Sequence, residues 1–261
     1  MGYGYDKEGI IIGHAKPISK AEIMELFKNE DSMCRVSSQT EIEGNIKGTG
    51  FFVKINNKDI PFDKCLMTNN HILNENYIKN HNRIEIIYKN ETKFISLKNE
   101  NRKVFTDEKL DYTIIEILDE DKIEHFFEIA QNINGIYDKD IFILQYLDSN
   151  ELLFSSGKIE SIEGNIIKHT YPTSKGASGS PIILRNSISN IIGLHFGSEK
   201  NKKYNLSTNI NSIVNDIIKK EKSIHIIIGE IIIEREDINK EIRIINSYDE
   251  SFRERKFKII I

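Results

Sequence analysis

The feature that most constrains the fold of this chain of 261 residues is a succession of short apolar runs that begins near residue 32. Stretches rich in Asn, Gly, Lys and Asp separate the runs. Runs of this kind, recurring roughly every ten residues, are typical of β-strands in a sandwich or barrel. The chain is therefore predicted to be all-β. We expect strands at residues 50–55, 65–68, 83–88, 112–118, 141–146, 152–159, 165–169, 181–184 and 191–196.

Two segments instead carry apolar residues at helical spacing. In residues 19–30, Ser19 can cap a helix, and Glu22 follows three positions later, which is the pattern of a capping box. Residues 208–220 place Ile and Val on one face and Lys at the C-terminal end, which favours a helix. The chain is then expected to end in an extra β segment. Its predicted strands are residues 224–233, 241–245 and 257–261.

Composition excludes several classes of protein. The 36 Lys and Arg residues against 40 Asp and Glu leave a net charge of −4, so the chain lacks the basic field that binds nucleic acid or an acidic membrane surface. Two cysteines cannot build a disulfide scaffold or a four-cysteine zinc site. The first residues lack the basic start and apolar core of a signal peptide, and no apolar run reaches membrane-spanning length. We therefore expect a cytoplasmic protein with no nucleic-acid or membrane partner.

The segment Gly176-Ala177-Ser178-Gly179-Ser180 is the first candidate for chemistry. Glycines on both sides of Ser178 let the backbone turn sharply and expose the hydroxyl. They also let backbone N–H groups converge on one point, as an oxyanion hole requires. A serine is inert at its own pKa and needs a base, so Ser178 alone is equally well explained as a turn residue.

Two further residues can supply the base and the acid that orients it. His71 follows a predicted strand in the sequence Thr68-Asn69-Asn70-His71, and Asp111 stands at the start of another. Each has a simpler alternative: His71 can be a core histidine, and Asp111 can merely cap a strand, with Asp107 as a nearby competitor.

These three segments together resemble the trypsin-like serine peptidases of chymotrypsin fold, with His, Asp and Ser in the order of that family. The resemblance covers roughly residues 32–220. It implies two packed six-stranded antiparallel β-barrels with the site in the cleft between them. It assigns His71 as general base, Asp111 as its orienting acid and Ser178 as nucleophile. The backbone N–H groups of Gly176 and Ser178 take the oxyanion-hole role, and no metal or cofactor is needed.

The sequence departs from the secreted members of the family. Ile72 follows His71 where secreted trypsins have a cysteine, and Ala177 precedes Ser178 where zymogen-activated members have an aspartate. Ala177 cannot pair with a freed N-terminus, so we expect no trypsin-style activation. Cys34 and Cys65 are predicted to be buried thiols.

A second resemblance concerns the substrate pocket. In bacterial glutamyl endopeptidases and in viral cysteine proteases of the same fold, a Thr five residues before the nucleophile and a His on the following strand bind a Glu or Gln side chain. Thr173 and His195 match these positions and imply a preference for Glu or Gln at P1. Phe196, Gly197 and Ser198 would then pair with the substrate backbone as an added strand. The alternative is that Thr173 is a turn residue and His195 merely lines the cleft.

The predicted organisation has four parts. Residues 1–31 form an N-terminal extension with a helix, residues 32–118 the first barrel, residues 119–221 the second barrel with its closing helix, and residues 222–261 a C-terminal β-rich extension. A serine endopeptidase acting on proteins or peptides is the predicted function. Two alternatives stay open: an esterase, and a catalytically silent binding protein of the same fold that recruits a partner through residues 222–261.

Overall fold

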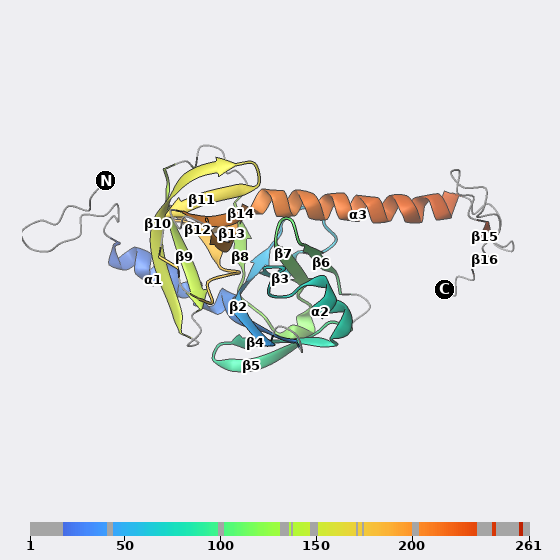
Figure 1. Ribbon diagram of the computed structural model, residues 1–261, viewed down its shortest axis with the longest axis horizontal. Helices are drawn as coiled ribbons and strands as arrows, with labels where there is room; N and C mark the ends of the chain where they lie inside the picture. The colour runs from blue at the N-terminus through green and yellow to red at the C-terminus, as the bar shows by residue number, and fades with distance from the viewer. Residues whose placement is uncertain are drawn as a thin grey trace, which may run out of the picture. The chain divides into compact units, whose positions relative to one another are not determined.

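The computed structural model (Figure 1) describes residues 18–40, 44–98, 102–130, 136, 138–146, 151–170, 172–173, 175–199, 204–233, 242–243 and 256–257. The chain divides into two compact units, Met1–Val214 and Asn215–Ile261. Fourteen strands of the first unit form one continuous sheet. The predicted all-β class is therefore confirmed.

Six of these strands close into an antiparallel barrel, the second barrel. Their order is β12-β9-β10-β11-β14-β13, and pairing of β12 with β13 closes the ring. Its interior is rich in isoleucine, with Ile143, Ile167 and Ile182 buried. The predicted six-stranded barrel is thus present. The strands are β9 (Asp140–Tyr146), β10 (Leu152–Glu163), β11 (Ile166–Thr170), β12 (Pro181–Leu184), β13 (Ser187–Ser198) and β14 (Asn205–Asn209).

Seven earlier strands form the other half of the sheet, here called the first β group, which lies beside the second barrel in Figure 1. They follow the antiparallel order β5-β4-β1-β2-β3-β7-β6. Among the residues that the structure describes, no pairing joins β5 to β6, so this group has seven strands on an open path. The strands are β1 (Met33–Thr40), β2 (Gly44–Lys54), β3 (Lys64–Thr68), β4 (Arg83–Tyr88), β5 (Glu91–Ser96), β6 (Val104–Asp107) and β7 (Tyr112–Glu116).

The short strand β8 (Phe127–Ile129) connects the two halves. It runs parallel to β2, with Phe127 opposite Val53, and parallel to β13, with Ile129 opposite Ile191. A strand therefore lies shortly after residue 118, the predicted boundary between the two barrels. The 3₁₀ turn η2 (Asp119–Asp121) lies between that boundary and the strand.

Strand β4 illustrates how the sequence selects strand and register. Ile84, Ile86 and Tyr88 are buried in the core of the first β group, whereas Arg83 and Glu85 are exposed. Successive side chains of a strand point to opposite faces, so this alternation fixes the register. Burying one isoleucine stabilises the fold by about 1.5–3 kcal/mol. A slip of one residue would therefore cost several such contributions.

The N-terminal helix α1 (Lys20–Lys28) has the predicted capping box. The Ser19 hydroxyl accepts from the N–H of Glu22, and the Glu22 carboxylate accepts from the N–H of Ser19 at 2.8 Å. The same carboxylate pairs with Arg185 at the end of the second barrel. The helix ends at Lys28, and the 3₁₀ turn η1 (Glu30–Ser32) leads into β1.

The prediction for residues 224–233 is wrong, because these residues belong to helix α3 (Ile210–Ile233) and not to a strand. The helix begins at Ile210, since Thr208 and Asn209 belong to β14 and the Asn209 side chain accepts from the N–H of Asn211 at 3.0 Å. No Gly or Pro interrupts residues 210–228. Once a helix has started, each added residue gains a hydrogen bond, and this outweighs the weak strand preference of isoleucine.

The sequence did not predict strands β1, β5, β6, β8 and β14 as separate elements. Strand β5 explains why, since only Ile95 of its six residues is buried. It lies at the edge of the sheet, where most side chains meet water and the apolar signal is lost.

The second compact unit holds most of α3 and a short ribbon. In that ribbon β15 (Ile242–Arg243) pairs antiparallel with β16 (Lys256–Phe257). These pairs fall within, or at the start of, the predicted strands 241–245 and 257–261. The rest of both predictions lies outside the described residues. No helix in the described part of the chain combines the length and the apolar character needed to cross a membrane.

Candidate active site

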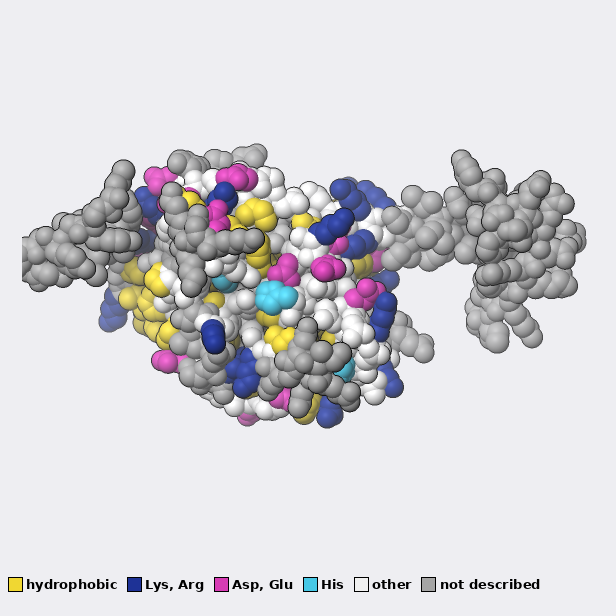
Figure 2. Space-filling model, viewed as in Figure 1, with side chains coloured by type: hydrophobic (Ala, Val, Ile, Leu, Met, Phe, Trp, Pro, Cys, Tyr) yellow, Lys and Arg dark blue, Asp and Glu magenta, His cyan; other side chains and the backbone are white. Residues whose placement is uncertain are grey.

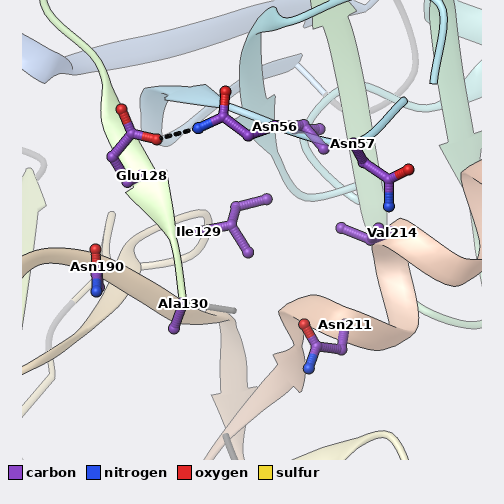
Figure 3. A pocket seen from close by; sticks show the side chains of 9 residues that line it. Asn56, Asn57, Glu128, Ile129, Ala130, Asn190, Asn211 and Val214 are labelled. Atoms are coloured by element: carbon purple, nitrogen blue, oxygen red, sulfur yellow. Dashed lines mark hydrogen bonds between the residues drawn. The ribbon is translucent and has the colours of Figure 1, made fainter. Parts of the chain in front are cut away.

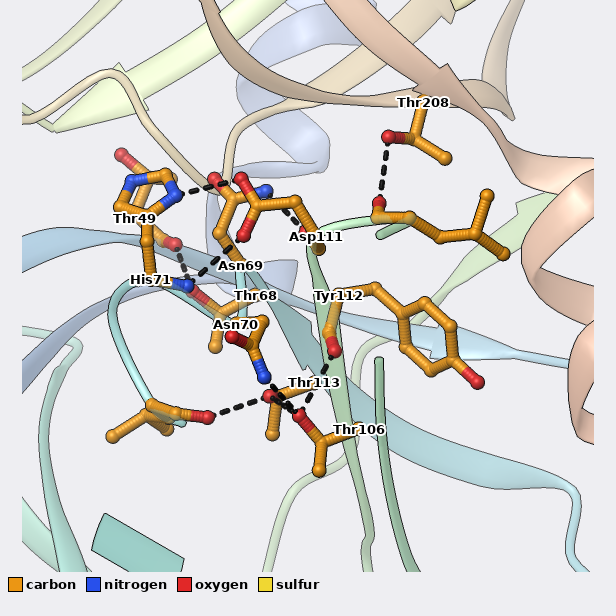
Figure 4. Close-up of polar contacts among 12 residues, drawn as sticks. Thr49, Thr68, Asn69, Asn70, His71, Thr106, Asp111, Tyr112, Thr113 and Thr208 are labelled. Carbon is orange, nitrogen blue, oxygen red and sulfur yellow. Dashed lines mark hydrogen bonds and ion pairs between the residues drawn. The ribbon is translucent and has the colours of Figure 1, made fainter. Parts of the chain in front are cut away.

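The imidazole of His71 faces the carboxylate of Asp111 (Figure 4). His71 Nδ1 lies 2.7 Å from Asp111 Oδ2, and the backbone N–H of His71 donates to Oδ1 of the same carboxylate at 2.9 Å. The two contacts hold both ring and backbone of His71 against one acid. With Nδ1 donating to the carboxylate, Nε2 is left as the acceptor for a proton. The His71 side chain is 45% exposed, so substrate can reach it.

Asp111 sits in a turn that several contacts hold in place. Its φ of 49° lies in the left-handed region, which Asp tolerates better than most residues. Asn69 donates from Nδ2 to the Asp111 carbonyl at 2.8 Å, and Thr208 of the second barrel donates to the Leu110 carbonyl at 2.8 Å. The competing Asp107 accepts from the N–H of Leu110 within this turn. Asp111, and not Asp107, therefore contacts the histidine ring.

The loop that carries Ser178 adopts the sharp turn expected of its glycines. Gly176 has φ 96° and Gly179 has φ 87°, both in the region that favours glycine. A Cβ on Gly179 would lie 1.9 Å from the Thr49 carbonyl oxygen, so the close approach of this loop to β2 also requires glycine.

Backbone contacts bring Ser178 close to the segment that carries His71. Thr49 of β2 donates from its N–H to the Ser178 carbonyl at 2.8 Å. A Cβ on the neighbouring Gly48 would meet both that carbonyl, at 3.0 Å, and the side chain of Ile72. The residue after His71 and the backbone of Ser178 therefore flank the same glycine. No hydrogen bond joins the Ser178 hydroxyl to the His71 ring in the part of the chain that is described. Figure 2 shows a histidine side chain with acidic neighbours exposed near the middle of this face.

The two predicted oxyanion-hole donors are on this loop. Neither the N–H of Gly176 nor that of Ser178 donates to another residue within the described ranges. Backbone N–H groups are normally paired, so two neighbouring donors that have no partner among the described residues are suited to an external oxygen. The Ala177 side chain between them is buried and carries no charge. The ion pair of zymogen-activated trypsins is thus impossible here.

Of the predicted pocket residues, 195–198 lie on β13 of the second barrel, and Thr173 lies outside the strands, three residues after the end of β11. Thr173 donates to Asn205 Oδ1 at 3.1 Å, and Asn205 lies opposite His169 on β11 and opposite Ser198 on β13. His195 is 3% exposed and its ring hydrogen-bonds to the backbone of Leu206.

Burial favours the neutral form of both His195 and the neighbouring His169. Burial lowers the pKa of His195 to about 4, with a smaller contribution from the charge of His71. Burial also holds the pKa of His169 well below its usual value, and the nearby His195 adds to this. The His169 and His195 rings lie 5.7 Å apart, and His169 Nε2 lies 2.8 Å from the Ser207 hydroxyl. Each ring therefore offers one donor and one acceptor.

The segment after His195 has one edge free of strand pairing. Gly197 and Ser198 pair with Leu206 and Asn205 of β14, and a bulge separates Gly197 from His195. On the opposite edge no described strand pairs with residues 196–198. A Cβ on Gly197 would meet open space.

Several residues of the site were not predicted from the sequence. Thr49 immediately precedes the predicted strand 50–55, and Thr208 is the first residue of the predicted helix 208–220. Their contacts span 127 and 98 residues along the chain, so no local pattern reveals them. His169 had no visible partner in the sequence, yet it is buried beside Ser207.

Two other features bear on the chemistry. Cys34 and Cys65 are buried free thiols, as predicted, and burial raises the pKa of both. No group of three His, Cys, Asp or Glu side chains is placed to hold a metal ion in the described segments.

A separate hollow of about 550 Å³ lies between the ends of β2, β8 and β13 and the start of α3 (Figure 3). Asn56 donates to Glu128 at 2.7 Å on its wall, and Ile129 and Val214 add apolar surface. It contains none of the predicted site residues.

Comparison with known proteins decides the family. A model of the trypsin-like peptidase domain matches residues 48–194, which is more than half of the chain. The chain belongs to this trypsin-like peptidase family. As a member it is a serine-type endopeptidase, a hydrolase that acts on proteins or peptides. The matched range contains His71, Asp111 and Ser178.

Solved structures agree on the fold of this trypsin-like peptidase. The serine endoprotease from Yersinia pestis is 12% identical, with a TM-score of 0.58 over 78% of this chain and 68% of that chain. The active form of the Rv3671c protease from M. tuberculosis is 15% identical, with a TM-score of 0.57 over 78% and 92% of the two chains. Deg5 is 14% identical, with a TM-score of 0.56 over 76% and 94%. No curated protein sequence matches this chain.

Proposed function

We propose that Ser178, His71 and Asp111 carry out peptide hydrolysis through an acyl-enzyme. The observation that carries this proposal is the double contact between His71 and Asp111, made beside a loop that offers the serine and two N–H donors with no partner in the described ranges. The acid fixes the ring tautomer, and the ring presents Nε2 as a base.

In the first step the Ser178 hydroxyl oxygen bonds to the substrate carbonyl carbon while His71 Nε2 takes the hydroxyl proton. The N–H groups of Gly176 and Ser178 bind the resulting oxyanion. His71 then gives its proton to the leaving amine as the C–N bond breaks. Water hydrolyses the acyl-enzyme by the same steps in reverse.

Replacement of the nucleophile tests this assignment. Ser178→Ala should lower kcat on peptide substrates by about four orders of magnitude or more while the fold survives, because no other group can form the acyl-enzyme. Ser187→Ala, at the start of β13 and outside the proposed site, is the matched control and should keep wild-type activity. Hydrolysis that survives in Ser178→Ala would overturn the assignment.

For the substrate side chain we propose Glu or Gln at P1, bound by Thr173 and His195. Support comes from the hydrogen bond of Thr173 to Asn205, which pairs with Ser198 of β13, and from the buried His195 on that same strand. A hydroxyl and an imidazole can each donate a hydrogen bond to an amide or carboxylate oxygen, and neither carries the negative charge that would select Lys or Arg. Phe196, Gly197 and Ser198 would pair with the substrate backbone along their free edge.

Cleavage of a peptide library would test this preference. Cleavage after Glu or Gln is expected in the wild type, with the preference weakened in Thr173→Ala. A profile dominated by Lys, Arg or aromatic residues would contradict it.

We also propose the boundaries between the four predicted parts at residues 31, 118 and 221, which limited proteolysis would test. A partner-binding role for residues 222–261 is a further proposal, which deletion of those residues would test. A cytoplasmic location is proposed on the two free thiols, which persist in reducing compartments. Cell fractionation would test it.

A further inference from the structure

One buried threonine of the first β group contacts the loop of the second barrel that carries the nucleophile. Thr49, on β2, is fully buried. Its hydroxyl donates to the Gly176 carbonyl at 2.8 Å and accepts from the Tyr146 N–H at 2.9 Å. Tyr146 is the last residue of β9. The side chain therefore bridges the Ser178 loop and the wall of the second barrel from a strand that belongs to neither.

The backbone of Thr49 adds two more contacts to the same place. Its N–H donates to the Ser178 carbonyl, and its own carbonyl accepts from the Thr68 hydroxyl at 2.8 Å. Thr68 is the last residue of β3, three positions before His71. One residue thus connects the nucleophile loop, the strand that leads to the base and the second barrel.

These contacts fix the backbone of the Ser178 loop at the two residues that carry the proposed oxyanion donors. The carbonyls of Gly176 and Ser178 are both held by Thr49, and the two proposed oxyanion donors belong to the same residues. Gly176 has a positive φ and no side chain of its own to restrain it. Without these contacts the backbone of the Ser178 loop would rotate easily at Gly176. An oxyanion hole stabilises the transition state less when its N–H donors are misaligned.

We propose that Thr49 is a positioning residue that holds the oxyanion hole in its active geometry across the junction between the two halves. The inference rests on the proposed function of Ser178. A hydroxyl is required, because the group must donate to one backbone unit and accept from another. Valine has nearly the same shape and can do neither.

The test compares Thr49→Val and Thr49→Ser with wild type. Thr49→Val should lower kcat about 10- to 100-fold with little change in KM, since the hole acts on the transition state. Its affinity for a peptide aldehyde, which forms a tetrahedral adduct with an active-site serine, should fall by a similar factor. Thr49→Ser keeps the hydroxyl and should restore both quantities to within a few-fold.

Controls separate positioning from general destabilisation. Ile95→Val removes one buried methylene from the edge strand β5, which pairs only with β4 among the described strands, and should lower the melting temperature without changing kcat or aldehyde affinity. If Thr49→Val does not fold, Thr49→Cys replaces it, because a thiol hydrogen-bonds only weakly and should give an intermediate kcat.

The outcomes are distinguishable. A folded Thr49→Val or Thr49→Cys whose kcat and aldehyde affinity stay within about twofold of wild type would overturn the inference and leave the proposed function intact. A wild-type protein whose hydrolysis does not depend on Ser178 would overturn the proposed function itself.

Discussion

At the scale of single residues, the proposed site depends on side chains that hold other groups in place. His71, Asp111 and Ser178 each lie in a local motif, and the structure brings His71 and Asp111 into contact. Thr49 and Thr208 have no motif, because each acts through a backbone carbonyl on the other half of the sheet. Such contacts appear only once the fold is known.

Gly179 and Gly164 form a matched pair of glycines with positive φ. A Cβ on Gly179 would collide with the Thr49 backbone, whereas one on Gly164 would meet nothing within 4 Å. Gly179→Ala should therefore displace the Ser178 loop and lower kcat by at least about 100-fold. Gly164→Ala carries only the cost of its backbone conformation, about 1 kcal/mol, and should keep wild-type kcat. Equal activities of the two variants would contradict the loop geometry.

The buried His195 predicts a pH dependence of stability. Its pKa is about 4 in the folded state, below the ordinary value of 6.5. Between pH 6.5 and 4 the unfolded chain therefore binds a proton at His195 that the folded chain does not bind. The contribution of neutral His195 to the free energy of unfolding is complete above pH 6.5. It is lost as the pH falls from 6.5 toward 4, by up to about 3 kcal/mol.

Urea unfolding across this range would measure the effect. His195→Gln removes the titrating group and should give a shallower fall in the free energy of unfolding between pH 6.5 and 4 than wild type. Parallel curves for the two proteins would show that His195 is not buried in the neutral form.

At the scale of elements, strands with alternating burial were predictable and edge strands were not. Residues 83–88 alternate and match β4, whereas β5 buries only Ile95. The largest error, at residues 224–233, arose because a run rich in isoleucine fits a strand or a helix. Residues 224–233 continue directly from an amphipathic helix, and this continuation favours the helix over a strand.

The capping box of α1 gives a prediction for an element outside the site. Ser19→Ala removes the side-chain acceptor for the Glu22 N–H and should destabilise the protein by about 1 kcal/mol. Thermal unfolding would measure the loss. Because α1 contributes no residue to the proposed site, kcat should not change. A loss of activity without a loss of stability would assign α1 a part in catalysis.

At the scale of the whole molecule, each half of the sheet holds a loop of the other. Thr49 of the first β group binds the Ser178 loop, and Thr208 of the second barrel binds the Asp111 turn. The strand β8 joins the same two halves through parallel pairing. The proposed site therefore depends on how the two halves meet, and the sequence order of the motifs carries no information on that contact.

A double-mutant cycle tests this mutual support. Thr208→Val should lower kcat roughly tenfold by loosening the turn that aims Asp111 at His71. In Thr49→Val/Thr208→Val the loss should be smaller than the product of the single losses, because both act on one concerted step. Measured kcat values that multiply within error would mean that the two threonines act independently.

Covalent labelling tests the central claim most directly. A fluorophosphonate should react with the wild-type protein at one site, and peptide mapping by mass spectrometry should locate the adduct on Ser178. The labelling rate should fall by at least about 100-fold in His71→Ala, since the ring activates the hydroxyl. An adduct on another serine, no adduct at all, or an undiminished rate in His71→Ala would contradict the account.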